Sequence, residues 1–171
     1  WVNNIFKEKV KPKIVRYNSL ERLLTNAVSS HIPLEVEWGC SLSGGVDSSL
    51  LCALAKSMGH DFNCYTLDTG GGQDLKCAKE VSKYLGVPLK LVKVNDLDIE
   101  NAIPKVIESL GTFQIELVLG GLFTYFISRE AYKDGLKVLL FGEGADELFG
   151  GYNKYRLFLD RSSEFANEMM L

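Results

Sequence analysis

The fold is decided by one short stretch of sequence, Ser41-Leu42-Ser43-Gly44-Gly45-Val46-Asp47-Ser48-Ser49. It joins the apolar run 36–42, which predicts a buried strand, to residues 47–58, whose apolar side chains recur at helical spacing. The two glycines permit positive φ angles and let backbone N–H groups approach a ligand closely. The helix start adds unpaired N–H donors with partial positive charge, and three serine hydroxyls add further donors. The stretch therefore predicts a cradle for an oxyanion such as phosphate.

Asp47 stands where a lysine would be expected to grip a phosphate. The loop contains neither the Walker pattern Gly-x-x-x-x-Gly-Lys-Ser/Thr nor the Rossmann pattern Gly-x-Gly-x-x-Gly. A carboxylate beside a phosphate needs a bridging cation, so Asp47 implies Mg²⁺. The alternative is a glycine-serine turn in which Asp47 only caps the helix.

Strands and helices alternate along the rest of the chain. The apolar patterns predict further strands over 62–67, 89–94 and 138–141, and helices over about 18–32, 74–85, 99–110 and 117–133. This alternation predicts an α/β fold with three α/β/α layers and a parallel, Rossmann-like sheet covered on both faces. Ligands of such sheets bind at the carboxyl ends of the strands, where residues 41–49 lie.

A second glycine-rich stretch follows the predicted strand 138–141 and reads Phe141-Gly142-Glu143-Gly144-Ala145-Asp146-Glu147-Leu148-Phe149-Gly150-Gly151-Tyr152. Its three carboxylates would repel one another if they were buried without partners, so we expect them to face water, cations or ligand groups. Asp146 is the candidate for a second carboxylate on the cation that Asp47 holds. For Glu147 we prefer the alternative of an acidic helix start, which the helix dipole favours.

Length and composition predict one folded domain. The chain has 171 residues, of which 46% are hydrophobic, enough for a sizeable core. We divide it into an N-terminal arm, residues 1–17, and a domain, residues 18–171, that ends in an amphipathic helix around Tyr155, Phe158 and Leu159. Because the chain opens at Trp1, we expect it to be trimmed or a piece of a longer protein.

Charge and cysteine usage restrict the partners. The 19 basic and 22 acidic side chains give a net charge of −3, which argues against nucleic acid or an anionic membrane as a partner. No apolar stretch has the length of a membrane span, and no signal-peptide pattern opens the chain. The four cysteines lack a paired spacing, as is typical of free thiols in a reducing compartment. These features predict a cytoplasmic protein.

The two glycine-rich stretches also carry a family resemblance. Residues 41–49 resemble the signature of the PP-loop superfamily, whose members split ATP into AMP and pyrophosphate. Residues 142–152 look like the hallmark of one branch of it, the asparagine synthetases and β-lactam synthetases. The resemblance extends over residues 20–155. It implies an ATP-dependent amide ligase: a carboxylate attacks the α-phosphate of ATP, and a nitrogen nucleophile then displaces AMP from the acyl-adenylate.

The resemblance implies roles for individual positions. The departing pyrophosphate would lie on the loop formed by Leu42, Ser43, Gly44, Gly45, Val46, Asp47, Ser48 and Ser49. The backbone of Leu67 would read adenine, and the backbone of Gly142 would lie near the nucleotide. Glu143 would be a proton acceptor at the reacting centre, and Tyr152 would lie near the substrate, although a simply packed aromatic ring is an equal alternative for Tyr152. The metal ligands would be Asp47 and Asp146.

Departures from the family pattern bear on the substrate. Leu119 stands where asparagine synthetases usually carry an arginine, which holds a carboxylate by a bidentate fork that leucine cannot make. Phe141 replaces a small residue before Gly142. No residue is assigned to a lysine that family members carry farther along the chain. The resemblance thus implies ATP and a small carboxylic acid as substrates, argues against aspartate, and leaves free ammonia or a partner glutaminase as the nitrogen source.

Competing hypotheses stay open at this point. The retained carboxylates of Asp47, Glu143 and Asp146 favour an amide ligase, whereas Leu119 and the unassigned lysine favour an ATP-binding regulatory or scaffold protein of the same fold that has lost catalysis. Another PP-loop reaction, such as tRNA modification, would call for a basic face or paired cysteines, and the sequence shows neither.

Overall fold

A parallel four-stranded sheet forms the centre of the part of the chain that the computed structural model describes, residues 17–68 and 70–152. The strands are β1 (Trp38–Ser41), β2 (Asn63–Asp68), β3 (Leu89–Lys93) and β4 (Val138–Leu140). The helices are α2 (Tyr17–His31), α3 (Val46–Ser57), α4 (Gln73–Leu85), α5 (Asp96–Leu110), α6 (Ile115–Lys133) and α7 (Ala145–Phe149).

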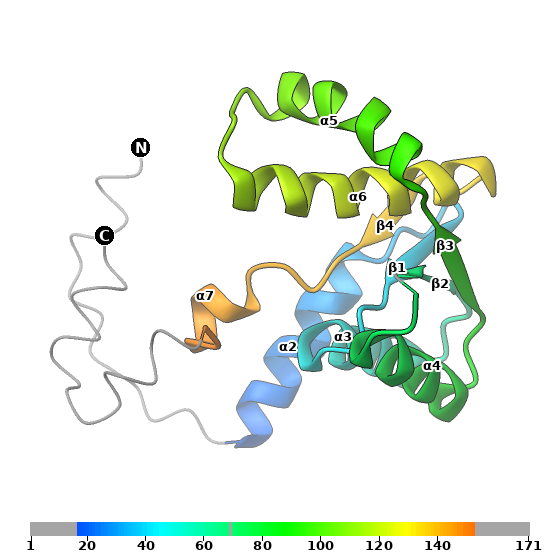
Figure 1. Ribbon diagram of the computed structural model, residues 1–171. Helices are drawn as coiled ribbons and strands as arrows, with labels where there is room; N and C mark the ends of the chain where they lie inside the picture. The colour runs from blue at the N-terminus through cyan, green and yellow to red at the C-terminus, as the bar shows by residue number, and fades with distance from the viewer. Residues whose placement is uncertain (1–16, 69, 153–171) are drawn as a thin grey trace, which may run out of the picture.

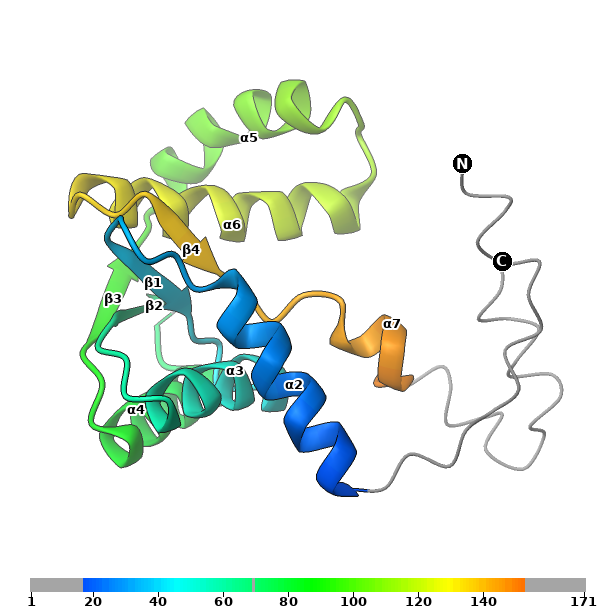
Figure 2. The ribbon, with the colours of Figure 1, turned by 180° about the vertical axis from the view of Figure 1, so that it is seen from behind.

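Helices cover both faces of the sheet (Figure 1). On one face α6 contacts β2 and β3, and α5 packs on α6. On the other face α3 contacts β1 and α4 contacts β2, while α2 runs alongside α3, as the reverse view in Figure 2 shows. The strand order is β3-β2-β1-β4, so β1 is an inner strand. The predicted three-layer α/β/α fold with a parallel sheet is confirmed.

Alternating residues of β2 contribute to two hydrophobic cores, because successive side chains of a strand point to opposite faces. Cys64 belongs to the core on the α3 and α4 side of the sheet, and the next residue, Tyr65, belongs to the core on the α6 side. Both side chains are fully buried. The two cores hold the two helical layers onto the sheet independently.

Successive side chains of β1 also alternate between the two faces of the sheet, and this alternation decides which residues lie near the site at the end of the strand. Cys40 and Leu42 are buried in the α3-side core. Gly39 faces the other side of the sheet, toward α6. A Cβ there would lie 2.7 Å from the Leu136 side chain and 2.6 Å from the carbonyl oxygen of Asn63. Ser41, two residues further on, therefore shares the α6 face, and it is 3% exposed.

Element boundaries agree with the sequence patterns to within a few residues. Helix α5 begins earlier than predicted because Asn95 caps it: its side chain accepts from the Asp98 N–H, and the Asp98 carboxylate accepts from the Asn95 N–H. Helix α4 ends at Gly86 in the left-handed conformation, as predicted. Strand β1 is shorter than the apolar run 36–42, because only residues 38–41 pair with β2 or β4.

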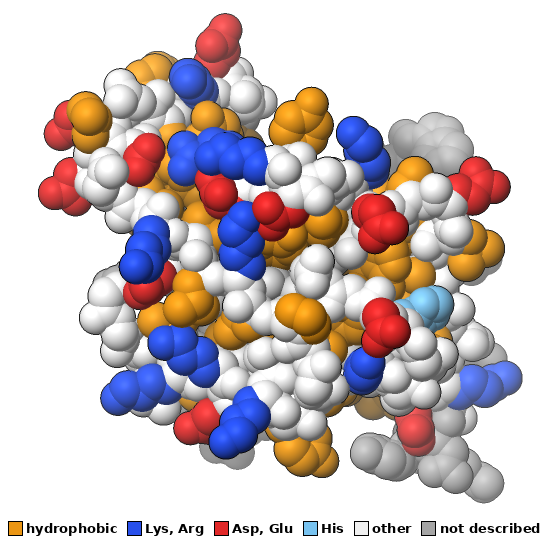
Figure 3. Space-filling model, turned by 90° about the vertical axis from the view of Figure 1, so that its right-hand side faces the viewer, with side chains coloured by type: hydrophobic (Ala, Val, Ile, Leu, Met, Phe, Trp, Pro, Cys, Tyr) orange, Lys and Arg blue, Asp and Glu red, His pale blue; other side chains and the backbone are white. Residues whose placement is uncertain are grey.

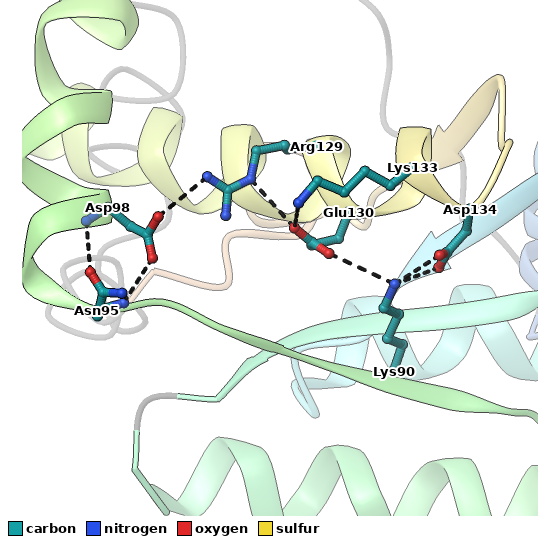
Figure 4. Close-up of polar contacts among 7 residues, drawn as sticks. All are labelled: Lys90, Asn95, Asp98, Arg129, Glu130, Lys133 and Asp134. Atoms are coloured by element: carbon teal, nitrogen blue, oxygen red, sulfur yellow. Dashed lines mark hydrogen bonds and ion pairs between the residues drawn. The ribbon is translucent and has the colours of Figure 1, made fainter.

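A network of charged side chains ties α6 to the sheet and to α5 (Figure 4). The Lys90 ammonium donates to both carboxylate oxygens of Asp134 at 2.8 Å, and the Tyr65 hydroxyl donates to the same carboxylate at 2.8 Å. On α6, the Arg129 guanidinium lies 3.7 Å from the Asp98 carboxylate of α5. The Lys90 hydrogen bond is the largest cause that lowers the pKa of Asp134.

Basic and acidic side chains are interspersed on the face shown in Figure 3, with hydrophobic side chains between them. On the described part of this face, neither sign of charge forms a broad patch. Among residues 17–68 and 70–152 no single helix is long and apolar enough to cross a membrane; α5 and α6 meet that test only as a pair bent by 110°.

The four cysteines are free thiols, as predicted, and Cys40, Cys52 and Cys64 are fully buried. The Cys52 and Cys64 sulfurs lie 3.8 Å apart, and this contact and burial raise the pKa of Cys64. The N-terminal arm, apart from Tyr17 at the start of α2, and the amphipathic helix expected around Tyr155 lie outside the described residues.

Candidate functional site

The Ser-Gly loop between β1 and α3 is held by its own serines. The Ser48 hydroxyl lies 2.9 Å from the Ser43 hydroxyl, accepts from the Ser43 N–H at 3.2 Å and donates to the Gly45 carbonyl at 3.3 Å. The Gly45 N–H donates to the Ser43 hydroxyl at 3.3 Å. Helix α3 starts at Val46 without a side-chain cap, so the N–H groups of its first turn remain available to a ligand.

Gly44 fixes the loop against the neighbouring helix. It has φ +87°, and a Cβ there would lie 2.6 Å from both the Ala78 nitrogen and the Asp74 carbonyl oxygen, and 2.8 Å from the Cys77 Cβ. Only glycine combines this backbone conformation with so close an approach to α4. The loop is therefore a rigid connection whose shape depends on α3 and α4 together.

The second glycine-rich stretch meets the first one directly. A Cβ on Gly142 would lie 2.8 Å from the Ser48 nitrogen and 3.0 Å from the Asp47 carbonyl carbon. The contact arises because β4 pairs with β1 in register, Cys40 opposite Leu140, so both strands end at the same edge of the sheet. The expected meeting of the two stretches in space is therefore present.

A cleft of about 210 Å³ opens where the two stretches meet. Its walls come from β1, the start of α3, the middle of α6 and the segment after β4, namely Ser41, Ser43, Asp47, Ser48, Phe123, Phe141, Gly142, Glu143, Gly144, Asp146 and Glu147. Cavities that enclose a whole drug-sized ligand usually measure at least about 300 Å³. The described cleft is therefore sized for the phosphates and reacting groups of a nucleotide rather than for a complete nucleotide.

The donor set of the cleft fits a magnesium ion bound together with a phosphate ligand. Asp47 and Asp146 both line the cleft, one from each stretch. Within the described ranges, no three acidic, histidine or cysteine side chains come close enough to hold a metal alone. Mg²⁺ is usually bound by one or two carboxylates, with phosphate oxygens and water completing its shell. Two carboxylates beside three serine hydroxyls are therefore suitable for it.

Helix α7 begins with two acids, Asp146 and Glu147, in its first turn, so the interpretation of Glu147 as an acidic helix start is confirmed. Glu147 also lines the cleft. Tyr152 is not among the described residues of the cleft wall; its hydroxyl donates a hydrogen bond to the Glu147 carboxylate. This bond lowers the pKa of Glu147 and, as the largest cause, raises the pKa of Tyr152 to about 12. Tyr152 is thus hydrogen-bonded to a residue of the cleft wall, and its expected place near the substrate stays a prediction.

The remaining candidate residues divide into two groups. Ser43, Asp47, Ser48, Gly142, Glu143 and Asp146 all line the cleft. Three other loop residues lie outside the described cleft wall: the Leu42 side chain is fully buried, the Val46 side chain is 80% exposed, and the buried Ser49 hydroxyl has no hydrogen-bond partner among the described residues. Leu67 is half-buried on β2 and packs against the α6-side core. Its predicted contact with adenine stays a prediction.

Phe123 lines the cleft, although the apolar pattern of its helix does not mark it as a site residue. It lies in the middle of α6, and it packs against the α6-side core while lining the cleft. Helix α6 is apolar over residues 117–128 without a clear polar face, so its sequence does not indicate which side chain turns toward the ligand.

The parallel α/β/α fold and the uncapped Ser-Gly loop at the end of β1 are those of the PP-loop class. More narrowly, residues 19–169 match the family described as asparagine synthase. The chain belongs to the asparagine synthase family, which confirms the predicted resemblance.

Curated relatives agree with this assignment. Asparagine synthetase B (glutamine-hydrolyzing) of Escherichia coli is 30% identical over 159 residues, covering 85% of this chain and 29% of that protein. Asparagine synthetase (glutamine-hydrolyzing) 1 of Arabidopsis thaliana is 32% identical over 157 residues, covering 86% of this chain and 27% of that protein. The chain thus spans less than a third of the length of these two relatives.

Solved structures support the fold alone, since their sequences are distant. NMN synthetase from Francisella tularensis superimposes with a TM-score of 0.55 at 18% identity, over 82% of this chain and 60% of that one. Glutamine-dependent NAD⁺ synthetase from Acinetobacter baumannii, in complex with ADP, gives a TM-score of 0.55 at 16% identity, over 85% of this chain and 29% of that one.

Proposed function

We propose that this chain is the nucleotide-binding part of an ATP-dependent amide ligase that adenylates a small carboxylic acid and transfers nitrogen to it. The observation that carries the proposal is the meeting of the two glycine-rich stretches, which brings Asp47 and Asp146 to one cleft at the carboxyl ends of β1 and β4. Family membership and the names of the curated relatives support the same reaction class.

The chain's own residues have distinct tasks in this proposal. The Ser-Gly loop receives the β- and γ-phosphates on its serine hydroxyls and on the N–H groups at the start of α3. Asp47 and Asp146 hold Mg²⁺, which when bound offsets the charge of the phosphates. The backbone of Gly142 lies against that of Asp47 and Ser48, so it keeps the second stretch close to the departing pyrophosphate.

The reaction has two balanced steps. A carboxylate oxygen of the acid forms a bond to the α-phosphorus of ATP while the bond to the β-phosphate oxygen breaks, and pyrophosphate leaves with the electron pair. Ammonia then forms a C–N bond at the acyl carbon, and AMP leaves with the electrons of the C–O bond. The proton that the nitrogen loses passes to a base, for which Glu143 at the cleft wall is the candidate. The nitrogen comes from free ammonia or from a glutaminase, in keeping with the glutamine-hydrolyzing relatives.

The test follows AMP and pyrophosphate in the presence of ATP, Mg²⁺, ammonia and a panel of carboxylic acids. We expect both products to form only when an acid is present. Asp47→Ala should abolish Mg²⁺-dependent ATP binding while the protein stays folded. The matched control is Asp61→Ala, because Asp61 is an exposed carboxylate that pairs only with Lys56 among the described residues and lies outside the cleft wall. Unchanged ATP binding by Asp47→Ala would remove the metal role.

Glu143→Gln separates binding from chemistry. It should bind Mg²⁺-ATP like the wild type but release pyrophosphate or AMP at least about a hundredfold more slowly, the usual range for general base catalysis. A wild-type rate would exclude Glu143 from the mechanism. If ATP binds and no acid releases pyrophosphate, even with the longer protein that contains this chain, the alternative of a regulatory ATP-binding protein is the better description.

A further inference from the structure

The cleft has one apolar wall that the phosphate chemistry leaves unused. Phe123 from α6 and Phe141 after β4 both pack against the α6-side core and both line the cleft. They come from segments on the same side of the sheet as Ser41. The serines and the acids occupy the remaining walls. Any substrate that enters beside the phosphates therefore meets two aromatic rings that are fixed by the core behind them.

No positive side chain lines the described cleft. Its ionisable residues are Asp47, Glu143, Asp146 and Glu147, all acidic. Helix α6, which supplies Phe123, has no charged residue over 117–128. The next cation along it, Arg129, is engaged with Asp98 and Glu130, between which Figure 4 shows it, and it lies over the Phe126 ring.

This distribution discriminates between kinds of carboxylic acid. One carboxylate of the substrate is consumed by the reaction, since it bonds to the α-phosphorus. A second carboxylate on the same molecule would lie against aromatic rings or near like charges, without a cation in the described wall to pair with. An apolar chain in the same place would instead be buried against the rings, which is favourable.

We infer that the acyl substrate is a monocarboxylic acid with an apolar carbon skeleton rather than a dicarboxylic acid, and that Phe123 is a specificity-determining residue for it. This inference rests on the proposed function. It names the substrate class of the same site. In this inference α6 selects the acid, whereas the Ser-Gly loop binds only the phosphates.

Matched acids test the substrate class. Butyrate and succinate have the same four-carbon chain and differ only in the second carboxylate. With wild-type protein, Mg²⁺ and ATP, acid-dependent pyrophosphate release should show a kcat/KM at least about tenfold higher for butyrate than for succinate, and 3-phenylpropanoate should be accepted as well. A calorimetric titration of both acids into protein loaded with Mg²⁺ and a non-hydrolysable ATP analogue should give the same order of affinity.

Substitution of one wall residue tests the role of Phe123. Phe123→Arg places a cation in the apolar wall and should reverse or erase the preference for butyrate over succinate. Thr124→Arg is the matched control: Thr124 is exposed, follows Phe123 on the same helix and lies outside the described cleft wall, so the preference should stay unchanged. If Phe123→Arg does not fold, Phe123→Ser should lower the butyrate preference without adding charge.

The outcomes separate the inference from the proposed function. A wild-type preference for succinate or aspartate, in release or in binding, overturns the inference and leaves the ligase proposal intact. Tighter binding of butyrate without any pyrophosphate release supports the substrate class but overturns the ligase activity. A preference that is the same in the wild type and both Phe123 variants overturns the assignment of Phe123.

Discussion

Gly142→Ala is the sharpest test of how the site is assembled. The added Cβ would lie 2.8 Å from the Ser48 nitrogen, whereas ordinary contact begins at 3.4 Å, so one stretch must move by 0.6 Å to restore ordinary contact. The crowded atoms belong to the backbone of Asp47 and Ser48 and cannot rotate away. Overpacking of this kind costs about 1–3 kcal/mol. That cost should lower the melting temperature by several degrees, or weaken Mg²⁺-ATP binding by about 5- to 150-fold if the stretches separate.

Thermal denaturation and calorimetric titration with Mg²⁺-ATP measure the two effects on the same samples. Gly120→Ala is the control, because a Cβ there meets nothing within 4 Å and the residue lies inside α6. This control should raise the free energy of unfolding by about 0.5–1 kcal/mol. Wild-type stability together with wild-type ATP affinity in Gly142→Ala would refute the direct contact between the two stretches.

Three further predictions concern the scaffold. Gly121→Ala should lower the free energy of unfolding by about 1 kcal/mol in urea titrations, because the new Cβ lies 2.7 Å from the Val106 side chain; an unchanged midpoint would contradict the packing of α5 on α6. Asp134→Asn should destabilise the protein by about 0.2–1 kcal/mol at pH 7, a value that allows for solvent screening of the half-exposed Lys90 pair. Because the folded state lowers the pKa of Asp134, this contribution is present above about pH 3.9 and is lost as the pH falls through the folded pKa, so variant and wild type should converge in acid. Iodoacetamide should label Cys77 first, as seen by mass spectrometry, and should weaken Mg²⁺-ATP binding about tenfold through the contact with Gly44; full affinity of labelled protein would argue against that coupling.

Local patterns were sufficient for the fold because each element follows from nearby residues. The apolar spacing around Cys52 and Leu75, the glycine stop at Gly86 and the alternation of strands with helices are all visible in short windows of sequence. The Ser-Gly loop was equally local, since its serine hydrogen bonds join residues no more than five positions apart.

Contacts between segments that are far apart in the sequence could not be predicted from short windows of it. Gly39 belongs to no recognisable motif. Its lack of a side chain nevertheless leaves space for the Leu136 side chain, which comes nearly a hundred residues later. Phe123 faces the cleft because of how α6 is rotated over β2 and β3, and a helix that is apolar on most sides does not specify that rotation. Glu147 lies in the first turn of α7, as its sequence indicated, but its place on the cleft wall depends on contacts that the sequence does not show.

Unequal anchoring of the two glycine-rich stretches has a consequence for how such a site can change. The first is anchored on the α3 and α4 side of the sheet, through the buried Leu42 and through Gly44 against α4, so altering it would disturb that side of the scaffold. The second continues into α7, which buries none of its residues. Substitutions in α7 therefore cost little folding stability. Positions of α7 other than Asp146 could therefore change during evolution at little cost to the fold, while the phosphate loop stayed the same.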